Sequence, residues 1–170
     1  ISKGSGTQSN ENIEITQSMA PYSTTPNDPY FFRQWGLHNN GSFSLSPSTV
    51  DADVDMIEAW DITTGSSNIL MAVLDSGIRM NHPEFLGRIY INSAEQTNGM
   101  DDDANGYADD FSGWDFVNND NDPTDDHGHG TNVAGIAMAN GNNSVGYAGV
   151  DWNCKLLPIN VIISIITKIR

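Results

Sequence analysis

Apolar residues along the chain gather into short runs between polar stretches, and the spacing within each run predicts a helix or a strand. Residues 69–74 are continuously apolar over the length of a strand and end at Asp75, which is typical of a fully buried parallel strand. Residues 51–60 carry apolar side chains at helical spacing and acidic residues in the first turn, where they favour the helix dipole. We expect Gly65 to end that helix before the strand begins.

The second half of the chain also alternates between strand and helix patterns. Residues 114–117 are a short hydrophobic segment that we interpret as a strand, and residues 155–161 predict another. Pro158 lies within the second of these and argues against a central place in a sheet. Between them Thr131 precedes the small and apolar residues 133–139, so we expect a helix capped by the Thr131 hydroxyl. Helices alternating with apolar strands indicate an α/β fold.

The start of the chain differs in character from the rest. Residues 1–26 are rich in Ser, Thr, Asn, Gln and Gly and show no apolar periodicity, so we interpret them as a leader or linker. An aromatic segment follows at residues 27–37, and we expect the folded domain to comprise residues 27–170. The chain does not open with a charged start and an apolar core, so we expect that any signal peptide was removed or lies outside this sequence.

Composition narrows the possible partners. The formal net charge is −15, from 22 acidic and 7 basic residues, which argues against nucleic acid or an anionic membrane as a partner. The longest apolar stretch, residues 156–166, is interrupted by Pro158 and Asn160 and is too short to insert across a bilayer. Cys154 is the only cysteine, so an intrachain disulfide and a zinc site built from cysteines are both excluded. We expect its side chain to be a small buried hydrophobe.

The acidic residues are concentrated in one region, because ten of the 22 carboxylates lie between residues 101 and 126. Within it, oxygen-bearing side chains alternate around a glycine, as in the first half of an EF-hand loop: Asp101, Asp103, Asn105 and Asp109. The glutamate that closes such a loop is replaced by Ser112, so a complete EF-hand is not predicted. Crowded carboxylates repel one another unless a cation relieves them, and we therefore favour a calcium site over a merely solvated loop.

Two residues have the chemistry of a catalytic pair. Asp75 comes at the carboxyl end of a predicted parallel strand, where the working groups of open α/β sheets collect. His129 opens the predicted helix of small residues, which would hold its ring rigidly, as a general base requires. A carboxylate brought beside that ring can orient the imidazole and stabilise its charge.

The residues around this pair resemble two sequence blocks of the subtilisin-like serine proteases. Residues 73–78, VLDSGI, are similar to the aspartate block, and residues 129–135, HGTNVAG, to the histidine block. Their order also fits a family that runs Asp, His, Ser along the chain. The resemblance implies a three-layer α/β fold with a mostly parallel sheet, serine endopeptidase activity on polypeptide substrates, and secretion. It selects His129 rather than His127 as the base, because the catalytic histidine of the family directly precedes Gly-Thr.

The resemblance covers only part of the family's catalytic domain. The nucleophilic serine of the family lies in a Gly-Thr-Ser-Met-Ala block that residues 1–170 do not contain, and the oxyanion asparagine belongs to the same missing part. We therefore expect an amino-terminal portion of a longer domain, inactive alone. Residues 161–170 depart from the loop that the family places after this strand, and a truncation, a frame change or an internal deletion would each account for them. Residues 27–37 resemble the opening of the mature domain, which makes residues 1–26 the end of a propeptide or a linker.

The family resemblance also implies a second calcium site in the loop after the histidine helix. Glu84 stands where the family usually has aspartate, which lengthens that ligand by one methylene. The matching ligands are the side chains of Asn143 and Glu84, the carbonyl groups of Gly141, Val145 and Tyr147, and in addition the carboxylate of Asp28.

Other functions fit some of the same residues. The chain can be a non-catalytic calcium-binding or decoy module that keeps both blocks as structure. A metal-dependent hydrolase is less favoured, because His127 and His129 alternate on a loop and no predicted helix carries two histidines four residues apart. His82, which precedes Pro83 in a predicted turn, is expected to be structural rather than chemical.

Overall fold

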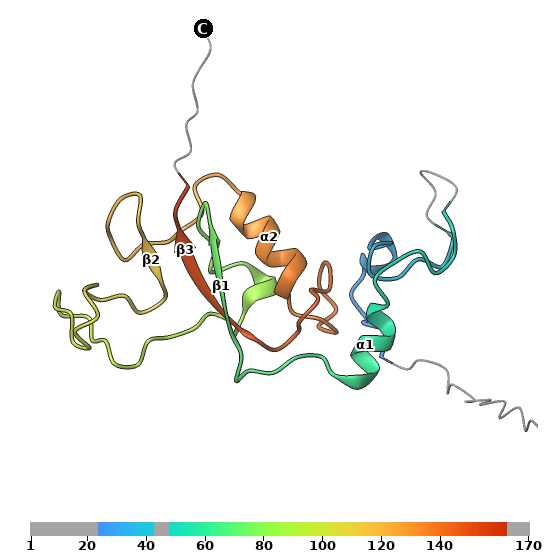
Figure 1. The fold of residues 1–170 in the computed structure, drawn as a ribbon, viewed down its shortest axis with the longest axis horizontal. Helices are drawn as coiled ribbons and strands as arrows, with labels where there is room; N and C mark the ends of the chain where they lie inside the picture. Colours follow the sequence, from blue (N-terminus) through green and yellow to red (C-terminus); the bar gives the residue numbers. More distant parts are fainter. Residues whose placement is uncertain (1–23, 43–47, 163–170) are drawn as a thin grey trace, which may run out of the picture.

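The computed structural model describes residues 24–42 and 48–162, and the centre of this region is a three-stranded parallel sheet (Figure 1). The strands lie in the order β1-β3-β2, and helix α2 lies along one face of the sheet. This arrangement confirms the predicted α/β fold. The elements are, in chain order, η1 (Phe31–Arg33), α1 (Met56–Ile62), β1 (Leu70–Asp75), η2 (Pro83–Phe85), β2 (Trp114–Asp115), α2 (His129–Met138) and β3 (Lys155–Asn160), where η denotes a 3₁₀ turn.

Two sequence expectations fall largely outside these residues. Most of the predicted leader, residues 1–26, is not among them, and neither are residues 163–170 of the unusual carboxyl-terminal segment. In the described part of the chain, none of the helices combines the length and the apolar character that a membrane span needs.

Strand β1 is buried on one face only, which corrects the prediction of a fully buried strand. Val73 and Asp75 are buried on the side of α2, whereas Leu70 and Leu74 point the other way and are 46% and 61% exposed. Successive side chains of a strand point to opposite faces of the sheet, so a continuous apolar run suits a strand whose sheet is covered on both faces. Among the described residues, a helix covers one face only, and the side chains on the other face of β1 are therefore exposed.

Pro158 lies in the central strand, which the sequence had argued against. In a central strand of a parallel sheet, the backbone N–H and C=O of one residue both point to the same neighbouring strand, and those of the next residue point to the other neighbour. Leu156 and Asn160, which share the parity of Pro158, exchange backbone hydrogen bonds with chain on the side away from β1. On that side β2 begins only at Trp114, opposite Ile159. The missing N–H of Pro158 therefore costs no bond in the sheet.

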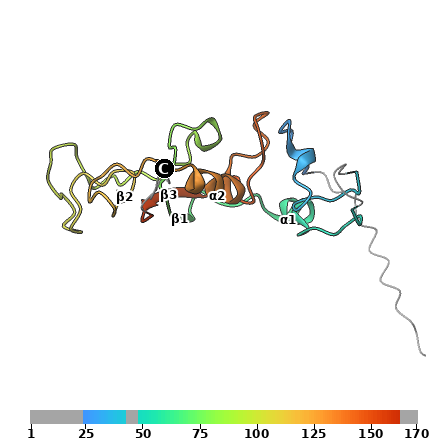
Figure 2. The ribbon, with the colours of Figure 1, turned by 90° about the horizontal axis from the view of Figure 1, so that it is seen from above.

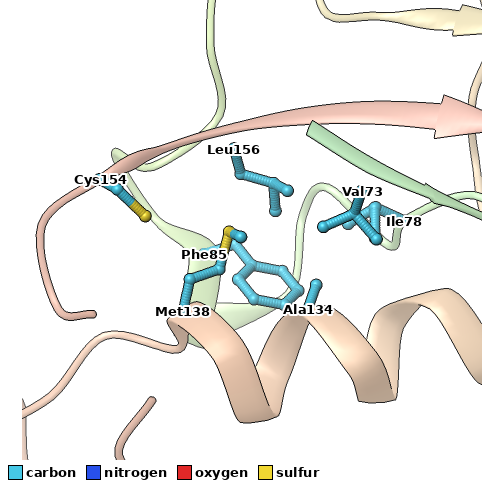
Figure 3. Packing of buried hydrophobic residues seen from close by; sticks show 7 residues of the cluster. All are labelled: Val73, Ile78, Phe85, Ala134, Met138, Cys154 and Leu156. Atoms are coloured by element: carbon cyan, nitrogen blue, oxygen red, sulfur yellow. The ribbon is translucent and has the colours of Figure 1, made fainter. Parts of the chain in front are cut away.

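The main hydrophobic core lies between the sheet and α2 (Figure 3). The ring of Phe85, 1% exposed, is inserted between β3 and the helix. Ala134 is fully buried, and its small side chain leaves room for that ring on the helix surface. Cys154 is buried in this cluster, as predicted, but its Sγ also accepts a hydrogen bond from the Arg88 guanidinium at 3.3 Å. The complete cluster is Val73, Ile78, Phe85, Ala134, Met138, Cys154 and Leu156.

A second core ties the aromatic segment at residues 27–37 to α1. Phe31 and Trp60 pack with ring centroids 5.8 Å apart, and Trp60 also lies 4.7 Å from the ring of Trp152. The indole of Trp60 donates a hydrogen bond to the carbonyl of Val150 at 2.8 Å, which satisfies its polar atom. Figures 1 and 2 both place α1 at one end of the molecule and the acidic loop that precedes β2 at the other.

Helix α1 begins later than predicted, and the N-cap predicted for α2 is wrong. Helix α1 starts at Met56 rather than at residue 51, because Asp55 has a left-handed backbone (φ +55°) and its N–H donates to the carboxylate of Asp53 in a turn. Helix α2 starts at His129, with Gly128 at the cap position, so Thr131 is not the N-cap. Strand β1 is shifted by one residue from the predicted 69–74, whereas β2 and β3 end before the predicted residues 117 and 161.

Candidate active site

Asp75 and His129, which are 54 positions apart in the sequence, form a hydrogen-bonded pair. Asp75 is the last residue of β1, and His129 is the first residue of α2. The Nδ1 atom of His129 lies 2.7 Å from Oδ1 and 2.9 Å from Oδ2 of Asp75. The Asp75 side chain is 11% exposed and that of His129 is 61% exposed. One ring nitrogen therefore meets the carboxylate, while much of the ring faces solvent.

The carboxyl group of Asp75 is held in its charged form. Burial opposes ionisation, but hydrogen bonds from His129 and from the Ser76 backbone outweigh it and hold the pKa of Asp75 below its ordinary value. The Ser76 N–H donates to Oδ1 of Asp75 at 2.7 Å. A charged carboxylate here favours the neutral tautomer with its proton on Nδ1 and stabilises a protonated imidazole.

Two glycines allow α2 to begin against the end of β1. A Cβ on Gly130 would lie 2.2 Å from the carbonyl oxygen of Gly77 and 3.0 Å from the Cβ of Asp75. Gly77 itself has a left-handed φ of +90°, and a Cβ there would lie 2.6 Å from the carbonyl oxygen of Pro123. The contact between Asp75 and His129 therefore depends on the absence of side chains at Gly77 and Gly130.

Two other histidines lie near this region and do not join the pair. His82 accepts a hydrogen bond from the Glu84 N–H at 3.2 Å, and its ring packs 5.7 Å from that of Phe85. It caps η2, in line with the structural role expected for it. His127 is exposed on the loop before α2, where its backbone N–H donates to Asp125.

Three carboxylates converge in the acidic loop. Oxygen atoms of Glu95, Asp103 and Asp110 all lie within 4.8 Å of one another. The side-chain amide of Asn105 donates to Asp103 at 3.3 Å and to Asp110 at 3.1 Å. Of the four ligands predicted in this loop, Asp103 belongs to the cluster and Asn105 contacts it.

The remaining predicted ligands of the loop bind backbone instead. Asp101 accepts from the N–H groups of Asn105 at 3.0 Å and Gly106 at 2.7 Å. Asp109 accepts from the N–H groups of Asn98 and Gly99, each at 3.0 Å. These contacts fold the loop.

The sequence interpretation did not include Glu95 and Asp110 among the ligands. Asp110 adjoins Asp109 in the same acidic segment, so its position in the sequence was a signal that could have identified it. Glu95 lies outside the alternating pattern. It is 4% exposed and accepts from three backbone N–H groups, those of Asp102, Asp103 and Asp109.

The side chains predicted to hold the second calcium ion also lie close together. The Asn143 side chain donates to Glu84 at 3.0 Å, and Glu84 accepts from the Tyr147 N–H at 3.1 Å. Asp28 accepts from the N–H groups of Asn142 and Asn143. Glu84 and Asp28 are 6% and 5% exposed, and no ion pair to either carboxylate is found among the described residues. Two buried carboxylates without a cationic side chain suit an oxygen-liganded metal ion.

A mainly apolar cavity of about 630 Å³ lies beside this loop rather than at the Asp75–His129 pair. It is bounded by the outward face of α2, including Ile136, and by Tyr30, Phe85 and Tyr147. Thr131, two residues from His129, also lines it.

Comparison with known proteins identifies the family. The sequence model of the subtilase family matches residues 66–164, more than half of the chain, and the match includes both Asp75 and His129. The chain belongs to the subtilase family. This result confirms the resemblance noted in the sequence.

Individual subtilases show the same relationship. The chain is 42% identical over 133 residues to subtilisin-like protease 1 of Plasmodium berghei, covering 77% of this chain and 20% of that protein. It is 32% identical over 152 residues to the halolysin-like extracellular serine protease Nep of Natrialba magadii, covering 86% and 22%. A solved protease structure from Pseudoalteromonas arctica superimposes with a TM-score of 0.58 at 27% identity, covering 82% and 39%. The chain thus spans about a fifth to two fifths of these proteins, and its fold is a partial subtilisin-like fold.

Proposed function

We propose that this chain is the part of a serine endopeptidase that carries the aspartate and the general base of an Asp-His-Ser triad. The observation that supports the proposal most is the 2.7 Å contact between His129 and Asp75 at the junction of β1 and α2. Family membership adds hydrolysis of polypeptides as the reaction class.

In this proposal His129 takes a proton from a serine hydroxyl. With its Nδ1 proton donated to Asp75, the ring presents Nε2 as the acceptor. The charged Asp75 then stabilises the imidazolium that forms while the serine oxygen attacks a peptide carbonyl. In this proposal the serine comes from a Gly-Thr-Ser-Met-Ala block outside residues 1–170, which do not contain one. Secretion is part of the proposal, in keeping with the extracellular relative from Natrialba magadii.

Calcium as a structural ion is a further part of the proposal. Calcium–oxygen distances of about 2.3–2.6 Å allow ligand oxygens to be up to about 5 Å apart across one ion. The carboxylate oxygens of Glu95, Asp103 and Asp110 meet this condition. Glu84, Asn143 and Asp28 would hold a second ion, which would balance the two buried carboxylates. The ion would supply structural charge compensation, and no part in the proton transfer is assigned to it.

A fluorophosphonate that labels activated serines tests the proposal. The full-length gene product should be labelled at one serine, and labelling should be lost in His129→Ala and strongly slowed in Asp75→Asn. His127→Ala is the matched control, because that ring lies two residues away and should leave labelling unchanged. Intact wild-type protein that takes up no label, or a His129→Ala variant that is labelled at the wild-type rate, would show the proposal to be wrong.

A non-catalytic calcium-binding or decoy module is the second candidate. Its supporting observations are the two groups of acidic ligands and the lack of a nucleophile block within residues 1–170. It predicts that residues 27–170 alone unfold cooperatively and that calcium raises their melting temperature. A non-cooperative melt with exposed apolar surface would favour the protease fragment instead, because a partial domain leaves apolar side chains such as Leu70 and Leu74 of β1 uncovered.

A further inference from the structure

The carboxylate of Asp125 connects the two elements that carry the candidate catalytic pair. Its Oδ1 accepts from the Ser76 hydroxyl at 2.9 Å and from the N–H groups of His127 and Gly128 at 3.0 and 2.7 Å. Its Oδ2 accepts from the Thr131 N–H at 2.9 Å and from the Thr131 hydroxyl. The donors therefore lie on both sides of His129 in the sequence and immediately after Asp75.

Ser76 and Thr131 extend these contacts across the junction of β1 and α2. The Ser76 hydroxyl donates to Asp125 and accepts from the Gly130 N–H at 3.0 Å, which satisfies an amide in the first turn of α2. The Thr131 hydroxyl accepts from the Arg79 N–H at 3.0 Å. The first turn of α2 is thereby hydrogen-bonded to Ser76 and Arg79, which follow Asp75 in the sequence.

We propose that Asp125 is a positioning residue for catalysis, which holds His129 in register with Asp75 by joining Ser76 at the end of β1 to Thr131 in the first turn of α2. The predicted effect on turnover rests on the proposed protease function. The predicted effect on geometry, that Asp125 maintains the His129–Asp75 hydrogen bond, does not depend on that function.

The negative charge of Asp125 is essential to this role because every group that contacts it is a donor. An asparagine would turn an NH₂ group toward one or more N–H donors and leave them unpaired. Burial raises the pKa of Asp125, but the hydrogen bonds from Thr131, Gly128 and His127 outweigh it and lower the pKa to about 2. The carboxylate consequently stays charged at neutral pH, next to the positive end of the α2 dipole.

A positioning role predicts a particular kinetic result. Displacing a base by about 1 Å costs on the order of 100-fold in rate, because the loss is felt in the transition state. Asp125→Asn in the full-length gene product should therefore lower kcat by about 10- to 100-fold and leave KM within about twofold. Asp122→Asn is the matched control. Asp122 lies in the same loop and accepts in the same way from the N–H and hydroxyl of Thr124, but it does not contact Ser76, Thr131 or the pair.

A second pair of variants separates the hydrogen bond from the side-chain volume. Thr131→Ser keeps the hydroxyl that donates to Asp125, whereas Thr131→Val keeps the shape and removes it. Thr131→Ser should keep kcat near the wild-type value, and Thr131→Val should reduce it in the direction of Asp125→Asn. If the role were only structural, loss of kcat would follow loss of melting temperature across all four variants, including Asp122→Asn.

Nitrogen NMR of the histidine rings provides a readout that needs no catalysis. Wild type should show His129 with its proton on Nδ1 in a protected hydrogen bond, and Asp125→Asn should show faster exchange of this proton and a mixture of tautomers. The proposal is overturned if Asp125→Asn leaves this signal unchanged, or if it lowers kcat no more than Asp122→Asn does. Wild-type protein that takes up no fluorophosphonate would contradict the protease function, and the NMR comparison would still decide the role of Asp125.

Discussion

Replacing Gly130 by alanine should separate the two halves of the candidate active site. The added Cβ would lie 2.2 Å from the carbonyl oxygen of Gly77, where 3.0 Å is the closest approach that real Cβ atoms show. This oxygen belongs to the backbone and cannot rotate away, so the start of α2 must move from β1 by about 0.8 Å. The Nδ1–Oδ1 distance between His129 and Asp75, now 2.7 Å, would grow to about 3.5 Å, beyond a good hydrogen bond.

Gly135 provides a matched control in the same helix. A Cβ there meets no atom of the described residues within 4 Å, so Gly135→Ala should stabilise the protein by about 0.5–1 kcal/mol through helix propensity. Gly130→Ala brings a similar propensity gain but adds an overpacking cost of about 1–3 kcal/mol. The difference between the two variants therefore reports mainly the clash with Gly77.

Urea unfolding and fluorophosphonate labelling of the full-length gene product measure both consequences. Gly130→Ala should be less stable than Gly135→Ala by about 1–3 kcal/mol, and its labelling rate should fall by about 100-fold. Gly135→Ala should keep the wild-type rate. If both variants matched wild type in rate and each other in stability, the close approach of α2 to Gly77 would not control the Asp75–His129 contact.

Three further predictions concern pH, calcium and the core. The lowered pKa of Asp125 means that its contribution to stability is complete above about pH 4 and is lost as the pH falls toward 2, so urea melts should show wild type and Asp125→Asn converging across that range; a constant difference would contradict this. Calcium should raise the melting temperature, and Glu95→Gln should reduce the rise while Glu58→Gln, on α1, should not; equal effects would argue against the acidic-loop site. Phe85→Ala should cost about 3–5 kcal/mol in urea unfolding, whereas Phe32→Ala, at a side chain 71% exposed, should cost less than about 0.5 kcal/mol; similar losses would contradict the assigned core.

Local sequence patterns predicted the class of fold and the candidate pair, and the structure has this fold and places Asp75 beside His129. The apolar run before Asp75 and the small residues after His129 specify a strand end and a helix start, and parallel strands carry their functional groups at that end. The same patterns were less reliable for boundaries. The turn made by Asp53 delays the start of α1, and Asp125 rather than Thr131 supplies acceptors at the start of α2.

The amino-acid order alone was enough to predict Asp75 and His129 as a candidate pair, because helix and strand periods, turn residues and family blocks are short-range properties of the chain. It could not show that Glu95 approaches Asp103 and Asp110, that Asp125 bonds to both Ser76 and Thr131, or that Pro158 fits a central strand. Those relationships join segments from different elements or depend on which side of a strand has a partner. They arise only when the sheet, α2 and the loops pack together, since packing sets distances that sequence spacing leaves open.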